Sequence, residues 1–330
     1  MKQLFVSVII PARNEEEFIG RCLDSLIAND YPKNRLEILV VNGASTDKTA
    51  AIAAGYSEKY PFIKVLENPR ITTPISMNIG VKSAKGDIVM IGGAHSTYNS
   101  DYISKSVRYL EKYGADNVGG ALQTKPAVNT YPARAIALAL SSFFGTGGAS
   151  FRVGGKKPTW TDTAFGGCFR KEVFGKIGYF NESLTRSQDM EFSIRLHRAG
   201  GKILFAPDIS TTYYPKTTFR EFWKHNIKDG IWAILPMKYG APPFKLRHLI
   251  PLIFVLSIIS PLILSIWYRP FLYLTFGVLG FYLLASLYFS IHIALKERNP
   301  ALIPYLVAVF AVRHFGYGIG SLIGLVKLIL

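Results

Sequence analysis

Residues 161–201 have the sequence TDTAFGGCFRKEVFGKIGYFNESLTRSQDMEFSIRLHRAGG. Gly166 and Gly167 let another group come close to the backbone, because glycine has no Cβ. A short amphipathic helix is predicted next, and a second helix opens at Asp189, where the helix dipole favours an ionised carboxylate. Such a carboxylate beside an open glycine shelf predicts a general base that takes a proton from a hydroxyl. The alternative is a helix cap made by Ser187 or Asp189.

Five short apolar runs precede this stretch, and helical segments separate them. The runs cover residues 4–10, 36–41, 63–66, 88–91 and 118–122. Runs of this length and composition are typical of buried parallel strands. Their alternation with helices predicts an α/β fold with a mostly parallel sheet and helices on both faces. Ligands of such sheets bind at the carboxyl ends of the strands, so the loops after the first, second and fourth runs form the candidate site.

Other sequence patterns narrow the class of protein. No GxGxxG follows the first run and there is no Walker A loop, which disfavours a dinucleotide-binding or P-loop enzyme. The glycine-rich segment 145–155, GTGGASFRVGG, is interpreted as a mobile active-site loop or an ordinary surface loop. Cys22 and Cys168 form no metal or redox pattern and are predicted to be buried as small hydrophobic residues.

The composition indicates a membrane partner. The 330 residues are 49% hydrophobic and carry a formal net charge of +16. This basic excess suits anionic lipid headgroups or a phosphate-bearing substrate. No nucleic-acid partner is expected, since the basic residues are scattered and the C-terminal part is apolar enough for a membrane. We therefore predict an α/β domain over residues 1–215, interfacial amphipathic helices over 216–247 and a transmembrane region over 248–330.

The predicted transmembrane region holds three apolar segments, at residues 249–267, 271–295 and 301–330. The third segment is interrupted by Arg313 and His314, so it crosses fully or breaks into a short span and an amphipathic piece. Arg313 is a candidate for binding a lipid phosphate, or it packs against the other helices. Four glycines in this segment would let helices approach closely. They are Gly316, Gly318, Gly320 and Gly324.

The charges around these segments predict the orientation. Lys245 and Arg247 precede the first segment, Lys296 and Arg298 follow the second, and Arg269 alone lies between those two. The positive-inside rule then places the N-terminal domain in the cytoplasm of a multi-pass membrane protein. Just before the first segment, residues 218–232 combine an apolar face with a basic one, as in a helix that lies on a membrane surface. The basic face holds Arg220, Lys224, His225 and Lys228.

Five motifs in order resemble the family 2 glycosyltransferases of the GT-A fold, and in particular their succinoglycan-biosynthesis ExoA-like group. The motifs are VSVIIPARNEE (6–16), ILVVNGASTDKT (38–49), MNIGVKSAKGDIVMIGGAH (77–95), TDTAFGGCFRKEVF (161–174) and SQDMEFSIRLHRAGGKI (187–203). The resemblance implies a nucleotide-diphospho-sugar transferase domain that covers the chain up to about residue 230.

The resemblance assigns residues to the nucleotide. Pro11, Ala12 and Glu15 are expected to line the base and ribose pocket, and Asn42 stands where the family usually has an aspartate that contacts the nucleotide. Gly93-Ala94-His95 stands at the family's DxD position, which holds the diphosphate through a divalent cation, Mn²⁺ or Mg²⁺. His95 is then the expected metal ligand, and a lone imidazole suits Mn²⁺ better than Mg²⁺. Basic side chains are the alternative partner of the diphosphate.

The resemblance also assigns residues to the donor sugar and the acceptor. Asp162, Gly166 and Gly167 are expected to face them. Gln188 and Asp189 stand at the family's Glu-Asp pair, with Asp189 as the base. His225 lies in the region that the family places near the acceptor and the diphosphate, or it contacts only lipid headgroups.

These expectations leave three functions open. The leading one is a membrane-bound inverting glycosyltransferase that moves a sugar from a nucleotide-diphosphate sugar to a lipid-linked or polysaccharide acceptor in cell-surface polysaccharide synthesis. The second is a polyprenyl-phosphate sugar synthase, in which a catalytic base matters less. The third is a non-catalytic relative that binds without transferring, because acidic residues are replaced at positions 42, 93 and 188.

Overall fold

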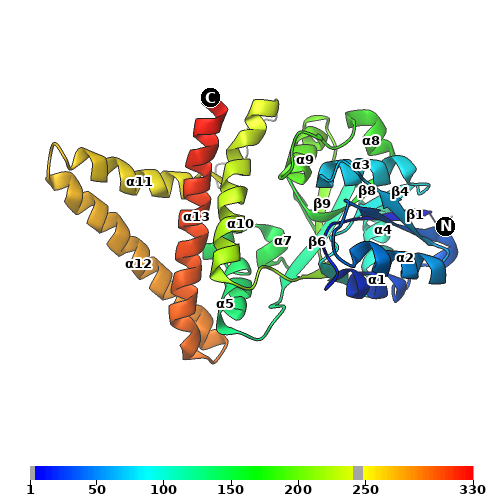
Figure 1. The fold of residues 1–330 in the computed structure, drawn as a ribbon, viewed down its shortest axis with the longest axis horizontal. Helices are drawn as coiled ribbons and strands as arrows, with labels where there is room; N and C mark the ends of the chain where they lie inside the picture. The colour runs from blue at the N-terminus through cyan, green and yellow to red at the C-terminus, as the bar shows by residue number, and fades with distance from the viewer. Residues whose placement is uncertain (1–3, 241–247, 330) are drawn as a thin grey trace. The chain divides into compact units, whose positions relative to one another are not determined.

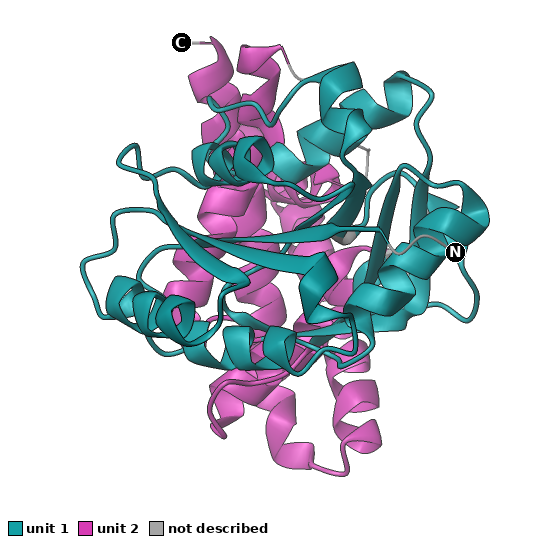
Figure 2. Ribbon diagram, turned by 90° about the vertical axis from the view of Figure 1, so that its right-hand side faces the viewer, with its two compact units in different colours: residues 1–123, 150–213 teal, residues 124–149, 214–330 magenta. Residues whose placement is uncertain are grey.

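A computed structural model describes residues 4–240 and 248–329, and the chain forms two compact units (Figures 1 and 2). Unit 1 comprises Met1–Gln123 and Ser150–Tyr213, and unit 2 comprises Thr124–Ala149 and Tyr214–Leu330. The predicted domain boundaries at residues 215 and 247 stay predictions. Lys245 and Arg247, on which the predicted orientation partly depends, lie outside the described residues.

Within the described residues, a nine-stranded sheet runs through unit 1 in the order β3-β2-β1-β4-β8-β6-β9-β5, with β7 also paired to β9. The strands are β1 Val6–Ala12, β2 Leu36–Asn42, β3 Ile63–Glu67, β4 Ile88–Ile91, β5 Ser96–Tyr98, β6 Asn117–Thr124, β7 Thr159–Thr161, β8 Phe165–Arg170 and β9 Ile203–Tyr213. The five predicted apolar runs correspond to β1, β2, β3, β4 and β6, so this part of the prediction is confirmed.

The sheet is mixed, which corrects the expectation of a mostly parallel one. β1 pairs in parallel with β2 and β4, and β2 pairs in parallel with β3. β8 is antiparallel to both β4 and β6, and β9 is antiparallel to β5 and β7. The strands β5, β7, β8 and β9 were not predicted from the sequence. The two glycines in β8 and the Pro207-Asp208 pair inside β9 weaken the local strand signal.

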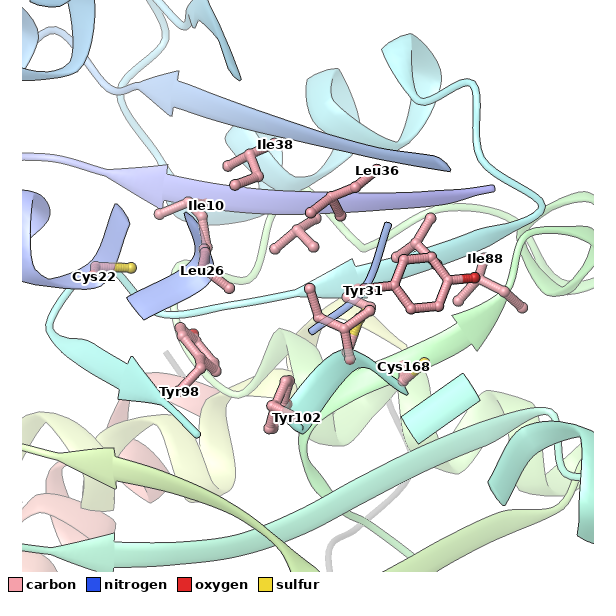
Figure 3. Packing of buried hydrophobic residues seen from close by; sticks show 14 of the residues in the cluster. Ile10, Cys22, Leu26, Tyr31, Leu36, Ile38, Ile88, Tyr98, Tyr102 and Cys168 are labelled. Carbon is pink, nitrogen blue, oxygen red and sulfur yellow. The ribbon is translucent and has the colours of Figure 1, made fainter. Parts of the chain in front are cut away.

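Helices cover both faces of the sheet, as predicted. On one face lie α1 Ile19–Ile27, α2 Thr49–Lys59 and α4 Tyr102–Tyr113, and on the other lie α3 Thr73–Ser83, α8 Glu172–Ile177 and α9 Gln188–Arg198. Side chains alternate between the two faces along each strand. In β1, Val8 and Ile10 join the first core and Ile9 joins the second. Figure 3 shows the first core, which also holds both free cysteines, as predicted.

The glycine-rich segment 145–155 is not one loop. It overlaps two short helices, α6 Phe143–Thr146 and α7 Ser150–Val153. Gly145 is buried, and a Cβ there would lie 2.1 Å from the carbonyl oxygen of Ala139. This glycine therefore serves close packing of α6 on the end of α5 (Tyr131–Leu140) and not loop mobility.

Unit 2 is helical. Besides α5 and α6 it holds α10 Phe219–Ile234, α11 Ile250–Leu264, α12 Pro270–Lys296 and α13 Ile303–Ile329. Among the described helices, α12 and α13 are long and apolar enough to cross a membrane. The first predicted segment forms α11, whose 15 helical residues fall short of the roughly 20 that a span needs. The third segment is one unbroken helix, so the alternative of a broken one is set aside.

The predicted close approach of helices at the glycines of α13 is confirmed. A Cβ on Gly320 would lie 2.2 Å from the carbonyl oxygen of Ile227 in α10, and one on Gly318 would lie 2.2 Å from that of Pro251 in α11. Part of the apolar face of α10, including Phe222, is thus buried within unit 2. Glycine is needed at these positions because a side chain would push the helices apart.

Arg313 packs against the other helices of unit 2. Its Nε donates to the carbonyl oxygen of Gly145 at 3.2 Å, and one terminal nitrogen donates to Asn226 and lies 3.7 Å from the Asp229 carboxylate. The neighbouring His314 makes two hydrogen bonds. Its Nδ1 lies 3.0 Å from the Tyr282 hydroxyl, and its Nε2 lies 2.9 Å from the carbonyl oxygen of Phe144. These contacts favour the packing alternative over a lipid-phosphate ligand for Arg313.

Candidate active site

The carboxyl edge of the parallel strands gathers most of the predicted site residues. Ala12 at the end of β1 lies opposite Asn42 at the end of β2. β4 ends at Ile91, directly before Gly93 and His95. Because β8 is antiparallel and Met90 pairs with Cys168, the residues that precede Cys168 in the chain lie at this same edge. The topology therefore brings the segment 162–167, with Asp162 and the glycine pair, toward the loops after β1, β2 and β4.

Glu15 and His95 meet directly, although they are 80 residues apart in the chain. The Glu15 Oε1 lies 3.0 Å from the His95 Nδ1, and both side chains are partly exposed. The His95 ring also lies against Tyr213, with 5.3 Å between ring centroids, and the Arg152 guanidinium lies 5.6 Å from the Tyr213 ring. This arrangement orients the imidazole through a carboxylate, as second-shell partners of metal-binding histidines do.

Arg152 is a basic residue at the site that the sequence analysis missed. It lies in α7, within the segment interpreted as a loop, and it reaches the β9 end of the site through Tyr213. Its only sequence signal was a single arginine among glycines, which does not distinguish a site residue from a surface residue. Guanidinium groups bind phosphate oxygens well, so Arg152 is a candidate partner of a diphosphate.

The loops after β1 and β2 are held together by side chains. The Asn14 side chain accepts from the Thr46 amide at 2.9 Å, and the Asn14 amide donates to the Ser45 hydroxyl at 3.1 Å. The Glu15 amide donates to the Thr49 hydroxyl at 2.7 Å, and Asp47 accepts from the Glu16 amide at 3.1 Å. This network fixes the position of Glu15.

Acid is expected to loosen this network. Burial raises the pKa of Asp47, but hydrogen bonds from Thr49 and from the Glu16 amide outweigh it and lower the pKa below its ordinary value of 3.8. A carboxyl whose pKa is lowered by folding stabilises the fold at pH values above its ordinary pKa. This stabilisation is lost as the pH falls through the pKa of the folded state. At pH values below about 4, the Glu16 and Thr49 amides should therefore be less protected against hydrogen exchange, after correction for the intrinsic exchange rate. Asp47→Asn should lack this pH step, and an unchanged step in that variant would contradict the assignment.

Asn42 is buried, and its carboxamide is engaged. Its Nδ2 donates to Glu67 Oε2 at 2.8 Å, and its Oδ1 accepts from the Ser45 amide at 3.2 Å. Gly43 follows it in a tight place, where a Cβ would lie 3.0 Å from the carbonyl oxygen of Ile71. Asn42 thus holds the loop after β2, and its contact with a nucleotide stays a prediction.

Glycine is not sterically required at position 93. A Cβ there would meet only the Ser96 hydroxyl, at 3.3 Å, whereas a Cβ on Gly92 would lie 2.5 Å from the Tyr98 hydroxyl. The Gly93 amide donates to Tyr98 at 2.7 Å, which fixes the backbone. A Cβ therefore fits where the family has its first DxD aspartate, once the Ser96 hydroxyl shifts by a few tenths of an ångström.

Among the described residues, no three His, Cys, Asp or Glu side chains are grouped so that they could hold a metal ion. The Glu15 carboxylate holds the Nδ1 side of His95, which leaves the other ring nitrogen of His95 as a donor. One imidazole donor fits a divalent cation that takes its remaining ligands from phosphate oxygens and water. The donor set thus suits a cation shared with a substrate better than a closed protein site.

Asp189 lies in the first turn of α9, one residue inside the helix. The N-cap is Ser187, which has a positive φ of 59° and makes no side-chain capping hydrogen bond. The alternative that the Ser187 side chain caps the helix is therefore wrong. Gln188 is buried, and its Oε1 has no hydrogen-bond partner within the described chain.

The direction of α9 points its N-terminus toward the carboxyl edge. Its C-terminal end leads through Gly200 and Gly201 to Lys202, whose carbonyl oxygen accepts from Asp116 at 2.9 Å. Asp116 in turn accepts from Arg170 at the end of β8, which is the amino edge of β4. A helix that ends at the amino edge and lies along the sheet starts near the carboxyl edge, about 16 Å away for 11 residues.

His225 belongs to unit 2. Its Nε2 lies 3.3 Å from the Asp229 carboxylate one turn along α10. The structure therefore gives it a partner within its own helix, and its predicted role near the acceptor stays a prediction.

One pocket of unit 1 lies elsewhere, at the amino edge of the sheet. It has a volume of about 740 Å³ and is lined in part by Lys82, Lys85, Arg170 and Lys171. Two of these cations are bound to backbone carbonyl oxygens, Arg170 to those of Ala115 and Leu110 and Lys171 to that of Ala84. We assign it no role in the reaction.

Comparison with known proteins identifies the class. The profile described as Glycosyl transferase family 2 matches residues 7–178, and that described as Glycosyl transferase family group 2 matches residues 101–312. The chain belongs to glycosyl transferase family 2, and it is a glycosyltransferase with a GT-A-like fold. The predicted family, fold and enzyme class are thereby confirmed, and the non-catalytic alternative is set aside.

Two curated relatives are similar over most of the chain. A dolichyl N-acetyl-alpha-D-glucosaminyl phosphate 3-beta-D-2,3-diacetamido-2,3-dideoxy-beta-D-glucuronosyltransferase of Methanococcus voltae is 28% identical and covers 98% of both chains. The succinoglycan biosynthesis protein ExoA of Rhizobium meliloti is 28% identical, over 89% of this chain and 87% of its own.

One solved structure supports the fold. A mannosyltransferase, PcManGT from Pyrobaculum calidifontis, superposes with a TM-score of 0.57 at 20% identity, over 95% of this chain and 88% of its own. At this identity the likeness concerns the fold alone.

Proposed function

We propose that this chain is a membrane-bound inverting glycosyltransferase. It moves a sugar from a nucleotide-diphosphate sugar to a lipid-linked acceptor during cell-surface polysaccharide assembly, with its catalytic domain in the cytoplasm. Two names support this proposal: the relative from Methanococcus voltae acts on a dolichyl phosphate carrying a sugar, and ExoA acts in succinoglycan biosynthesis. The two apolar helices α12 and α13 support membrane association.

The observation that carries the proposal is the placement of Asp189 at the start of α9, toward the edge where Glu15 and His95 meet. In the proposed reaction Asp189 takes the proton from the acceptor hydroxyl, which then displaces the nucleoside diphosphate from the sugar carbon. A single displacement of this kind inverts the configuration at that carbon. Asp162 and the pair Gly166-Gly167 would line the sugar.

The departing diphosphate needs positive charge. His95, oriented by Glu15, would hold a divalent cation together with phosphate oxygens, and Arg152 would add its charge directly. Such a cation supplies electrostatic stabilisation of the leaving group. The solved mannosyltransferase was captured with GDP-Man and Mn²⁺, which agrees with the preference of an imidazole for Mn²⁺.

The proposal is tested with a panel of UDP-, GDP- and dTDP-sugars and membranes that carry the protein. Glycolipid products are identified by mass spectrometry, and their anomeric configuration is read by NMR. A product with inverted configuration is the expected result. No transfer with any donor, or a product with retained configuration, would contradict the proposal.

Gly93→Asp should strengthen cation binding. The structure has room for a Cβ at this position, and a carboxylate there adds a hard oxygen donor beside His95. We expect the Mn²⁺ affinity in the presence of a nucleoside diphosphate to rise by about tenfold, since ligand charge tunes cation affinity over decades. Isothermal titration measures it. Gly93→Asn, which has the same shape without the charge, is the control, and an equal gain in both variants would disprove this role for the site.

A further inference from the structure

A charged helix runs beside the C-terminal half of α13. A Cβ on Gly316 would lie 3.1 Å from the Cβ of Asn226, one on Gly320 lies against Ile227, and one on Gly324 would lie 2.8 Å from the carbonyl oxygen of Ile231. The contacts advance together along both helices, so α10 and α13 run side by side in the same direction, as Figure 1 shows.

The outer face of α10 is basic. Arg220, Lys224 and Lys228 are all exposed, and their spacing of four residues places them in one stripe. If α13 crossed a bilayer upright, these charges would lie at the depth of its C-terminal half, in hydrocarbon. Charged side chains there are costly and normally face a partner or water.

The rest of α13 cannot cross alone. Residues 303–315 precede the part beside α10, and 13 helical residues extend about 20 Å, against a hydrocarbon thickness of about 30 Å. This part is itself covered, because Leu306 and Phe310 pack with Ala135 of α5. An apolar composition alone therefore overstates the ability of α13 to span.

The α11–α12 hairpin contacts the face of α13 opposite to the one that contacts α10. Gly318 contacts Pro251 of α11, whereas Gly316 and Gly320 contact α10. Residues two positions apart lie about 200° apart around a helix, so the hairpin and α10 are on opposite faces of α13. Figure 1 shows α11 and α12 meeting at a turn away from α13.

The hairpin has the surface of a membrane-inserted element. Its turn exposes Ile266 and Trp267 at 76% and 75%, and the apolar stretch of α12 is only 17% buried. Both ends of the hairpin lie against α13: Pro251 contacts Gly318, and Ala294 belongs to the same apolar cluster as Leu306. Lipid is the solvent that such an exposed apolar surface fits.

We propose that the α11–α12 hairpin enters the membrane as a re-entrant element, because the 15 residues of α11 are too few to span, and that α13 lies in the plane of the interface. The basic stripe of α10 then faces the phosphate-bearing headgroups of the lipids. It follows that the α12–α13 turn and the C-terminal end of α13 lie on the same side of the bilayer as α10. This proposal rests on the membrane association proposed above.

Sided labelling of cysteines introduced one at a time tests this arrangement in the full-length chain. Lys224→Cys, Glu297→Cys, Arg269→Cys and Lys327→Cys place thiols on α10, on the α12–α13 turn, on the hairpin turn and near the end of α13, all at exposed positions. In sealed vesicles oriented so that Lys224→Cys reacts with a membrane-impermeant maleimide, Glu297→Cys and Lys327→Cys should react equally, and Arg269→Cys should stay protected until detergent is added.

A crossing by α13 gives a different pattern. Lys327→Cys would then be protected while Glu297→Cys reacts, and this result would overturn the proposal. The native Cys22 and Cys168 are buried, and burial raises the pKa of both thiols, so they contribute little background. The labelling is divided by the amount of chain in the vesicles to correct for differences in expression, since denaturation would also expose Cys22 and Cys168. A chain found wholly in the soluble fraction would instead refute the membrane association itself.

Discussion

Asp189→Asn should reduce the rate of sugar transfer by about 10²–10⁴-fold, the usual contribution of a positioned general base. Asparagine keeps the size of the side chain and removes the charge that accepts the proton. Because the side chain is exposed in the first turn of α9, binding of the nucleoside diphosphate and the melting temperature should change little. Turnover is measured with the donor and the lipid acceptor identified by the panel, and binding by calorimetry.

The control for this variant is Glu172→Gln, which removes an exposed carboxylate paired with Lys176 on α8. Its activity should equal that of the unmodified chain. If Asp189→Asn kept full activity, Asp189 would not be the base. Full activity together with a product in which the sugar is attached to the phosphate of the lipid would identify the polyprenyl-phosphate sugar synthase instead, since a phosphate acceptor needs no base.

Phe192→Ala should destabilise unit 1 by about 3–5 kcal/mol, which is the usual cost of such a cavity. Phe192 is fully buried, and its ring centroid lies 4.5 Å from that of Phe180 and 5.1 Å from that of Phe174. A loss of this size is a large share of the roughly 5–15 kcal/mol that stabilises a domain. Since Phe192 lies one turn after Asp189, activity should fall together with stability.

Thermal melts of the full chain in detergent measure this effect. Phe143→Ala, at a ring that is 68% exposed, is the matched control and should leave the melting temperature nearly unchanged. Phe192→Leu, which fills more of the cavity, should recover part of the stability and of the activity. Equal melting temperatures for Phe192→Ala and Phe143→Ala would show that α9 is not anchored by this core.

Part of the site could be predicted from the sequence because its residues follow strands. Pro11, Ala12, Asn42 and His95 each stand at or just after the end of an apolar run, and the ends of parallel strands meet at one edge. The direct contact of Glu15 with His95 could not be predicted, since it depends on the register between strands far apart in the chain. The same holds for Arg152, which no local pattern distinguishes.

The sequence by itself determined the parallel half of the sheet, the family and the glycines of α13, because burial and close packing leave a periodic record in the residues. Only the tertiary structure decided that β8 returns antiparallel beside β4, bringing the segment 162–167 to the site. It also decided that α10 lies along α13, although composition alone describes α13 as a span. The reason is physical: local preference fixes what a segment can be, whereas its neighbours fix which of its faces meets protein, water or lipid.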